Sequence, residues 1–107
     1  MATYTAEAIT AAGTVLTPRT AAAGDKLVYD TNAVLRIING AGAPITATIT
    51  VAGNNAYGQA NPDPVISVTN GTTKAALMLP VYVDPSDNLI ALTWSSTTDV
   101  TFIYERR

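Results

Sequence analysis

Few side chains in this sequence could do chemistry. The chain has no histidine and no cysteine, which removes the usual general base near neutral pH, the commonest metal ligand and the thiol nucleophile. Its eight acidic residues fall almost entirely in expected turns, where Asp favours the bend through local hydrogen bonds. No spacing suggests a catalytic pair of carboxylates, and no serine has a suitable base available. We therefore expect neither an enzyme nor a cofactor or metal site.

Oxygen ligands gather in the segment DPSDN at residues 84–88. Asp84, Ser86, Asp87 and Asn88 could together surround a calcium ion. The segment lacks the regular spacing and the terminal bidentate glutamate of a calcium-binding loop. A turn that uses these side chains for its own backbone is the better interpretation.

The aromatic residues could instead form a platform on which a sugar stacks. Trp94 continues the apolar alternation of its expected strand, which favours a place in the core. Tyr57 lies in the long segment 52–64, and Tyr4 lies near the N-terminus. Because exposed aromatic side chains often dominate the free energy of protein binding, these two tyrosines are predicted to be exposed contact residues.

Charge is sparse along the whole chain. Charged residues make up 13% of the sequence, against about 25% in ordinary proteins. The six basic residues are scattered and the net charge is −2, so no nucleic-acid partner is expected. An ordinary low-charge β domain could have this composition. A surface of threonine, serine, asparagine and alanine nevertheless loses its water at little cost, which favours a chain that packs against neighbours.

The sequence contains no segment that predicts secretion or membrane insertion. The start, MATYTAEAIT, has no basic residue and no apolar core, unlike a secretory signal. The longest apolar run, AALMLPVYV at residues 75–83, has nine residues, far short of the ~20 that span a bilayer. We expect a protein that is made and used in the cytoplasm, or assembled there into something larger, without contact with a membrane.

Alternation predicts strands throughout. The segment ITATITV at residues 45–51 alternates apolar residues with threonine, the pattern of a strand with one buried face. Similar runs bounded by Gly, Pro, Asn and Asp predict nine strands in all, at residues 4–9, 14–20, 26–29, 34–39, 45–51, 65–69, 75–83, 89–95 and 100–104. This predicts an all-β, single-domain antiparallel β-sandwich of eight or nine short strands.

The N-terminal residues are expected to stand apart from the sandwich. Residues 14–107 would form the sandwich domain, and residues 1–13 would form an arm or edge strand. The arm could be frayed or paired at a sheet edge of its own chain. It could equally add a strand to a neighbouring subunit through main-chain hydrogen bonds.

The turns and faces follow from the same pattern. Asn39-Gly40 and Asn70-Gly71 predict tight hairpin turns. Pro18 predicts an edge strand, and Pro80 an edge or a bend. Residues 75–83 are apolar on both faces, which is typical of a central strand or an interface. The expected inward residues are Leu35, Ile37, Ile45, Ala47, Ile49, Val51, Ala75, Leu77, Leu79, Val81, Ile90, Leu92, Trp94, Val100, Phe102 and Tyr104. The residues predicted at protein contacts are Tyr4, Ile9, Asn55, Tyr57, Met78 and Tyr82.

Residues 24–107 carry a likeness to a known family. The segment AGDKLVYDTNAVLRIINGAGAPITATITVAG contains a strand of the form V-L-x-I-x-N-G, and a small-residue turn leads into an I-T-x-T-I strand. A long Pro/Asn-containing loop follows, then a strand ending near LPVYVDPSDN, and a closing hairpin LIALTWSSTTDVTFIYERR. This order resembles small virion proteins of tailed bacteriophages, described as capsid decoration, cement or minor capsid proteins.

The resemblance implies a jelly-roll-like sandwich without catalytic residues. Such proteins sit on the outside of an icosahedral phage head, commonly as homotrimers, and clamp neighbouring subunits of the major capsid protein. The expected function is thus that of a non-enzymatic virion structural protein that stabilises the capsid lattice. A tail, neck or fibre component of the same particle is one alternative, and a monomeric carbohydrate-binding β-sandwich is another.

Overall fold

The computed structural model describes residues 3–51, 53, 57–59 and 62–107. These residues form ten strands and one short 3-10 helix. The strands are β1 (Thr3–Tyr4), β2 (Glu7–Ala8), β3 (Arg19–Thr20), β4 (Lys26–Val28), β5 (Ala33–Asn39), β6 (Ile45–Thr50), β7 (Val65–Val68), β8 (Thr73–Leu77), β9 (Leu89–Trp94) and β10 (Val100–Arg106), and the helix is η1 (Pro80–Tyr82).

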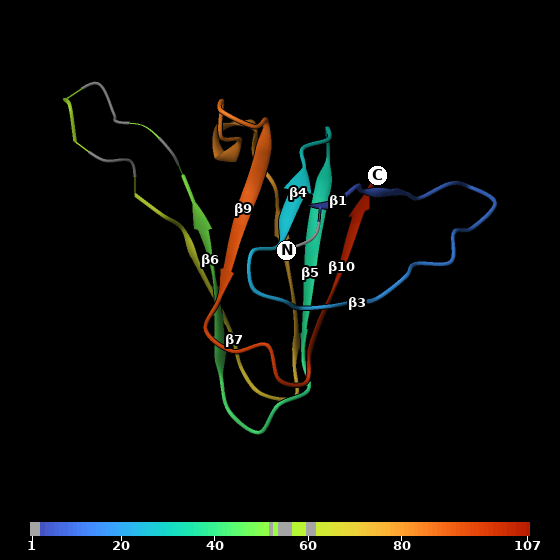
Figure 1. Ribbon diagram of the computed structural model, residues 1–107. Coiled ribbons are helices and arrows are strands. Elements are labelled where there is room, and N and C mark those ends of the chain that lie inside the picture. The colour runs from blue at the N-terminus through green and yellow to red at the C-terminus, as the bar shows by residue number, and fades with distance from the viewer. Residues whose placement is uncertain (1–2, 52, 54–56, 60–61) are drawn as a thin grey trace.

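The strands form two sheets that enclose the core (Figure 1). The first sheet has the order β1-β4-β9-β6-β7, and the second has the order β2-β10-β5-β8, with β3 also paired to β10. Strands β3 to β10 pair from the outside inward, as β3–β10, β4–β9, β5–β8 and β6–β7, all antiparallel. This is one long hairpin rolled so that β10 also meets β5 and β9 meets β6. The expected jelly-roll-like β-sandwich is confirmed.

The N-terminal residues add the two parallel pairings of the fold. β1 runs parallel to β4, and β2 runs parallel to β10. The single strand expected at residues 4–9 is therefore wrong, because the chain crosses from one sheet to the other between β1 and β2. Of the strand expected at residues 14–20, only β3 forms. Residues 9–18 instead make a segment that projects from the sandwich (Figure 1).

Alternation predicted the buried face of four strands. In β6, Ile45, Ala47 and Ile49 are buried, whereas the threonines between them are half-buried. The same phase is confirmed in β5, β9 and β10, whose buried apolar residues include Leu35, Ile37, Ile90, Leu92, Trp94, Val100, Phe102 and Tyr104. Val51 is half-buried and packs against this core. These buried residues and Leu27 of β4 belong to one hydrophobic core, which lies between the two sheets.

The phase expected for residues 75–83 is inverted. Met78 is only 2% exposed and belongs to the core, and Tyr82 packs against the core as a partly buried residue. The residues predicted to point inward are all exposed, namely Ala75, Leu77, Leu79 and Val81. Pairing with β5 fixes this phase, because the Met78 N–H donates to the Ala33 carbonyl (2.9 Å) and so places Met78 opposite the buried Ala33. Residues directly opposite each other in an antiparallel pair point to the same face. Met78 was predicted as an exposed contact residue, and that prediction is wrong because its side chain is buried. Tyr82 was predicted likewise, and its role in a contact stays a prediction because part of its surface is exposed.

Pro80 ends the strand that precedes it. Proline has no N–H to continue a ladder, and it suits the first position of a helix. β8 therefore stops at Leu77, and Pro80 begins η1. The segment expected as one strand over residues 75–83 is a strand followed by a helical turn.

The two Asn-Gly pairs do not form hairpin turns within one sheet. Each lies between strands of different sheets, β5 to β6 and β7 to β8. The Asn39 side chain is buried, and its Nδ2 donates to the carbonyls of Ala43 and Val68, both at 3.0 Å. Its Oδ1 accepts from the Ala41 N–H at 3.0 Å. Asn39 thus supports the crossing between sheets with its amide rather than with a positive φ.

Candidate protein-interaction edge

The N-terminal residues cover one side of the sandwich. β1 lies beside β4 at the edge of the first sheet, and β2 lies beside β10 at the edge of the second. The ladder is extended by a hydrogen bond from the Ile9 N–H to the Arg106 carbonyl at 2.9 Å. We call this the closed side of the sandwich, defined by β1 to β4 and β10. Of the alternatives for the arm, the structure has the one in which it pairs with its own chain.

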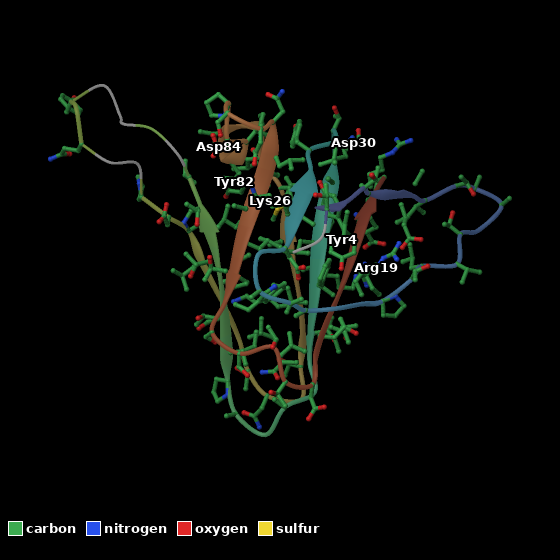
Figure 2. All side chains as sticks on the ribbon, in the orientation of Figure 1. Tyr4, Arg19, Lys26, Asp30, Tyr82 and Asp84 are labelled. Atoms are coloured by element: carbon green, nitrogen blue, oxygen red, sulfur yellow. The ribbon has the colours of Figure 1, made fainter. Side chains whose placement is uncertain are left out.

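Tyr4 holds the closed side together from within. Its ring meets the Phe102 ring edge-on, with centroids 5.1 Å apart, and the Arg19 guanidinium lies 5.5 Å from the Tyr4 centroid. Figure 2 shows Tyr4 and Arg19 together on this side. Tyr4 is half-buried and packs against the core. Tyr4 is thus less exposed than the sequence predicts, and its role as a contact residue stays a prediction.

Asp25 and Trp94 form a buried clamp beside β4. The fully buried Asp25 accepts at Oδ2 from the Trp94 indole N–H (3.1 Å) and from the Ala22 N–H (2.9 Å). Its Oδ1 has no hydrogen-bond partner among the described residues. The Trp94 ring stacks on Phe102 with centroids 5.6 Å apart. Its place in the core is confirmed, and Phe102 takes up one face of its ring.

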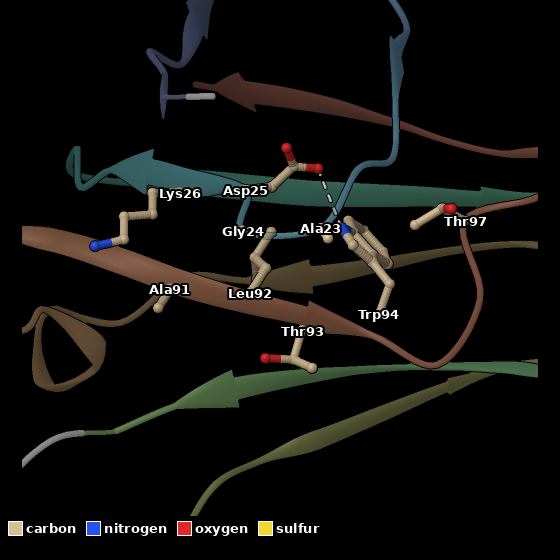
Figure 3. Close-up of a pocket in the computed structure, with 9 residues that line it drawn as sticks. All are labelled: Ala23, Gly24, Asp25, Lys26, Ala91, Leu92, Thr93, Trp94 and Thr97. Carbon is tan, nitrogen blue, oxygen red and sulfur yellow. Dashed lines mark hydrogen bonds between the residues drawn. The ribbon is translucent and has the colours of Figure 1, made fainter. Parts of the chain in front are cut away.

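A small pocket opens next to this clamp (Figure 3). Its volume is about 240 Å³, and its lining residues are Ala23, Gly24, Asp25, Lys26, Ala91, Leu92, Thr93, Trp94 and Thr97. Sites for small molecules usually measure about 300–1,000 Å³. Two of the polar groups at the pocket, Asp25 Oδ2 and the Trp94 N–H, already bond to each other.

The acidic turn at residues 84–88 uses its side chains for its own backbone. Asp84 Oδ1 accepts from the Ser86 N–H (2.9 Å), and Asp87 Oδ1 accepts from the Leu89 N–H (3.0 Å). Asp87 also pairs with Lys26, and this hydrogen bond lowers the pKa of Asp87 and raises the pKa of Lys26. Figure 2 shows Asp84 and Lys26 at this end of the sandwich. In the described part of the chain, no three acidic residues gather as a metal site would require.

A further acidic group is buried away from this turn. Glu105 is fully buried and accepts a hydrogen bond from Arg36 Nη2. Within the described ranges, Glu105 Oε2 and Arg36 Nε have no hydrogen-bond partner. One cation and one anion meet here, so the arrangement is an ion pair that joins β5 to β10.

The opposite side of the sandwich is bounded by β7 and β8. Each of these strands pairs with only one strand among the described residues, β7 with β6 and β8 with β5. The β7 edge is partly covered, because Lys74 Nζ donates to the Ser67 carbonyl (3.0 Å). We call this the open side of the sandwich.

The direction of the backbone groups of β8 follows from its pairing with β5. Met78 N–H donates to the Ala33 carbonyl, and Asn39 N–H donates to the Thr72 carbonyl (2.9 and 3.0 Å). In an antiparallel pair, residues that face the neighbouring strand alternate with residues that face away. The even-numbered residues of β8 therefore bond to β5.

The odd-numbered residues of β8 direct their N–H and C=O groups away from the sheet. These residues are Thr73, Ala75 and Leu77, and all three are exposed. No strand in the described part of the chain pairs with this edge. A row of unpaired backbone groups is a template on which a strand of another chain can pair.

Exposed apolar side chains continue from this edge into η1. Leu77 is 56% exposed and Val81 is 62% exposed, with Leu79 between them at 38%. Together with the exposed Ala75 we call them the β8–η1 apolar stretch. An exposed apolar stretch beside an unpaired strand edge is the arrangement expected of a protein-binding site.

The predicted contact residues do not lie on this edge. Ile9, 41% exposed, lies next to β2, and Tyr57, 90% exposed, lies between β6 and β7. Asn55 lies outside the described residues. The sequence did contain a signal for the β8–η1 apolar stretch, because residues 75–83 are apolar in both alternating phases. The phase predicted for these residues is inverted, so the residues of the β8–η1 apolar stretch are expected in the core although they are exposed.

Comparisons with family models, with curated proteins and with solved structures found no match. Among the described residues, no helix has the length and apolar character needed to cross a membrane.

Proposed function

We propose that this chain is a non-enzymatic structural protein of a tailed-phage virion, which binds the outside of the head and stabilises the lattice of the major capsid protein. The observation that carries the proposal is the β8–η1 apolar stretch beside the unpaired edge of β8. The sequence resemblance of residues 24–107 to capsid decoration proteins supplies the kind of partner.

The chemistry of the surface supports binding by burial rather than catalysis. Covering apolar surface stabilises a complex by about 25 cal/mol per Å². A shell presents many equivalent sites, so a small contact of this kind stabilises the particle through its repetition.

The number of copies in purified virions of the encoding phage tests this function. Quantitative mass spectrometry should find hundreds of copies per particle, as a shell component requires. A handful of copies would instead indicate a neck, tail or fibre component. Complete absence from the particle would contradict a virion role.

A charged side chain in the β8–η1 apolar stretch should weaken attachment. Losing the burial of one Leu-sized side chain costs at least about 1.4 kcal/mol, which is about tenfold in affinity. Leu77→Asp should therefore weaken the affinity for particles by about tenfold, which lowers the copies retained at subsaturating concentration. Val15→Asp is the matched control, since Val15 is 90% exposed and lies in the projecting segment 9–18. Equal retention of both variants would exclude this stretch as the attachment site.

A further inference from the structure

The unpaired edge of β8 has a geometry that fits a second copy of itself. Thr73, Ala75 and Leu77 present their N–H and C=O groups outward, as the pairing with β5 requires. Two antiparallel strands can share all three of these residues in one register, in which Ala75 faces Ala75 and Thr73 faces Leu77 of the other copy. A shift by two residues would bring in Leu79, whose carbonyl already accepts from Tyr82.

We infer that two copies of this chain pair through β8, antiparallel, about a two-fold axis at Ala75. The second sheets of the two copies would then join into one continuous sheet across the axis. The inference stands on the edge of β8 and does not depend on the proposed virion role. It differs from the trimer implied by the resemblance, because an isologous contact closes with two copies.

Charge permits this pairing. Lys74 is the single charged residue of β8, and its Nζ is bonded to the Ser67 carbonyl of its own chain. In the proposed register Lys74 lies opposite Ala76 of the second copy, so no like charges face each other. Arg36, on the neighbouring strand, is already paired with Glu105.

The other exposed strand edges are less suited to a partner. β7 has four residues, and Lys74 occupies the outward carbonyl of Ser67. The edges of β4 and β10 are covered by β1, β2 and β3. Natural edges are commonly protected by charge, proline or short length, and β8 has an outward row of groups with none of these on it. The complement of this neutral edge is another neutral edge, which a second β8 supplies.

The side chains of Ala75 and Leu77 would stand on the outer face of the joined sheet, where they stay open to a further partner, because side chains are roughly perpendicular to the sheet. Leu77 would lie against Thr73 of the second copy. Leu79 and Val81, farther along the chain, would approach the turn at residues 69–72 of the second copy. This turn is uncharged and exposed. A typical stable interface covers about 800 Å² per partner, more than a five-residue strand and a short apolar stretch provide. We therefore expect dissociation in about the micromolar range or weaker.

A single engineered cysteine tests the two-fold register. The natural chain has no cysteine, so Ala75→Cys introduces the sole thiol, and residues on the axis approach within disulfide distance. Ala75→Cys should oxidise to a covalent dimer at least about tenfold faster than Val15→Cys, because pairing raises the effective thiol concentration. Equal rates for the two variants would overturn the proposal.

A pair of variants checks the register independently. Thr73→Cys alone and Leu77→Cys alone should cross-link slowly, since each residue lies far from its own copy across the axis. A mixture of the two should give the heterodimer rapidly, because Thr73 faces Leu77. Rapid cross-linking of either variant alone would contradict this register.

Proline separates association from folding. Ala75→Pro removes an N–H that faces outward, which an edge strand tolerates, so the fold should persist while cross-linking through Thr73 and Leu77 is lost. Ala76→Pro is the matched variant, and it should unfold the chain because that N–H bonds to β5. Light scattering should show a monomer for Ala75→Pro and a monomer–dimer mixture for the natural chain. A trimer, or a natural chain that stays monomeric at about millimolar concentration, would contradict the inference even where virions contain the protein.

Discussion

The closed side and the open side of this sandwich differ in how their strand edges are covered. Both sides are sheet edges, which leave N–H and C=O groups unpaired. On the closed side, β1 and β2 lie along the edges and Tyr4 packs inward onto Phe102. On the open side, β8 keeps an unpaired edge beside exposed Leu77, Leu79 and Val81.

The difference separates residues that stabilise the fold from residues available to a partner. Aromatic rings and a buried carboxylate are concentrated on the closed side. Phe102 contacts the rings of Tyr4 and Trp94, and the Trp94 N–H donates to Asp25. The open side has small and aliphatic side chains without such contacts. Stability should therefore depend on the first group, and association on the second.

The largest expected change in the free energy of unfolding follows from removing the Phe102 ring, which contacts other aromatic rings of the closed side. Phe102 is fully buried and contacts both Tyr4 and Trp94. Phe102→Ala should lower the free energy of unfolding by about 3–5 kcal/mol, because it leaves a cavity. Urea denaturation measures this change. A loss below about 1 kcal/mol would mean that the closed side does not carry the stability of the fold.

A smaller loss of stability, which arises from Tyr104 on the closed side, should appear at alkaline pH. Tyr104 donates its hydroxyl proton to the Val28 carbonyl (2.7 Å), and burial raises the pKa of Tyr104 to about 12, with the Asp30 carboxylate adding to the shift. The raised pKa means that this contribution to stability is fully present below about pH 10 and is lost as the pH rises toward 12.

Tyr104→Phe isolates that contribution. The variant should lose about 1 kcal/mol at neutral pH, because the Val28 carbonyl loses its donor. Its stability should then fall less steeply than that of the natural chain between about pH 10 and 12. Unfolding curves for the two proteins across this range give the comparison, and parallel curves would argue against the assignment.

The smallest expected effect on stability lies on the open side. Leu77→Ala should change the free energy of unfolding by less than about 0.5 kcal/mol, because the side chain is largely exposed in the single chain. Cross-linking through Ala75→Cys should nevertheless slow in the double variant. A large loss of stability in Leu77→Ala would break the comparison between the two sides.

Alternation was a reliable guide where one face of a strand is apolar and the other is polar. The threonines of β6 specify which face is buried, since a one-residue shift would bury hydroxyl groups. Residues 75–83 have no such polar face, so either phase was open. Pairing with β5 and the helical turn at Pro80 chose the phase that buries Met78.

The candidate site was predicted least well, because it depends on contacts between residues that are far apart in the sequence. Tyr4 is predicted to be exposed because it lies in the expected N-terminal arm. Its burial depends on Phe102, which lies far away in the sequence. No local spacing reports a contact of that kind.

The sequence by itself determined the absence of histidine and cysteine, the all-β class and the inward faces of the strands that alternate clearly, because composition and hydrophobic period are local properties of the chain. Only the tertiary structure decided which edges are covered and which is open. That outcome depends on where β1 and β2 dock and on how β8 pairs with β5, and both join residues widely separated along the chain.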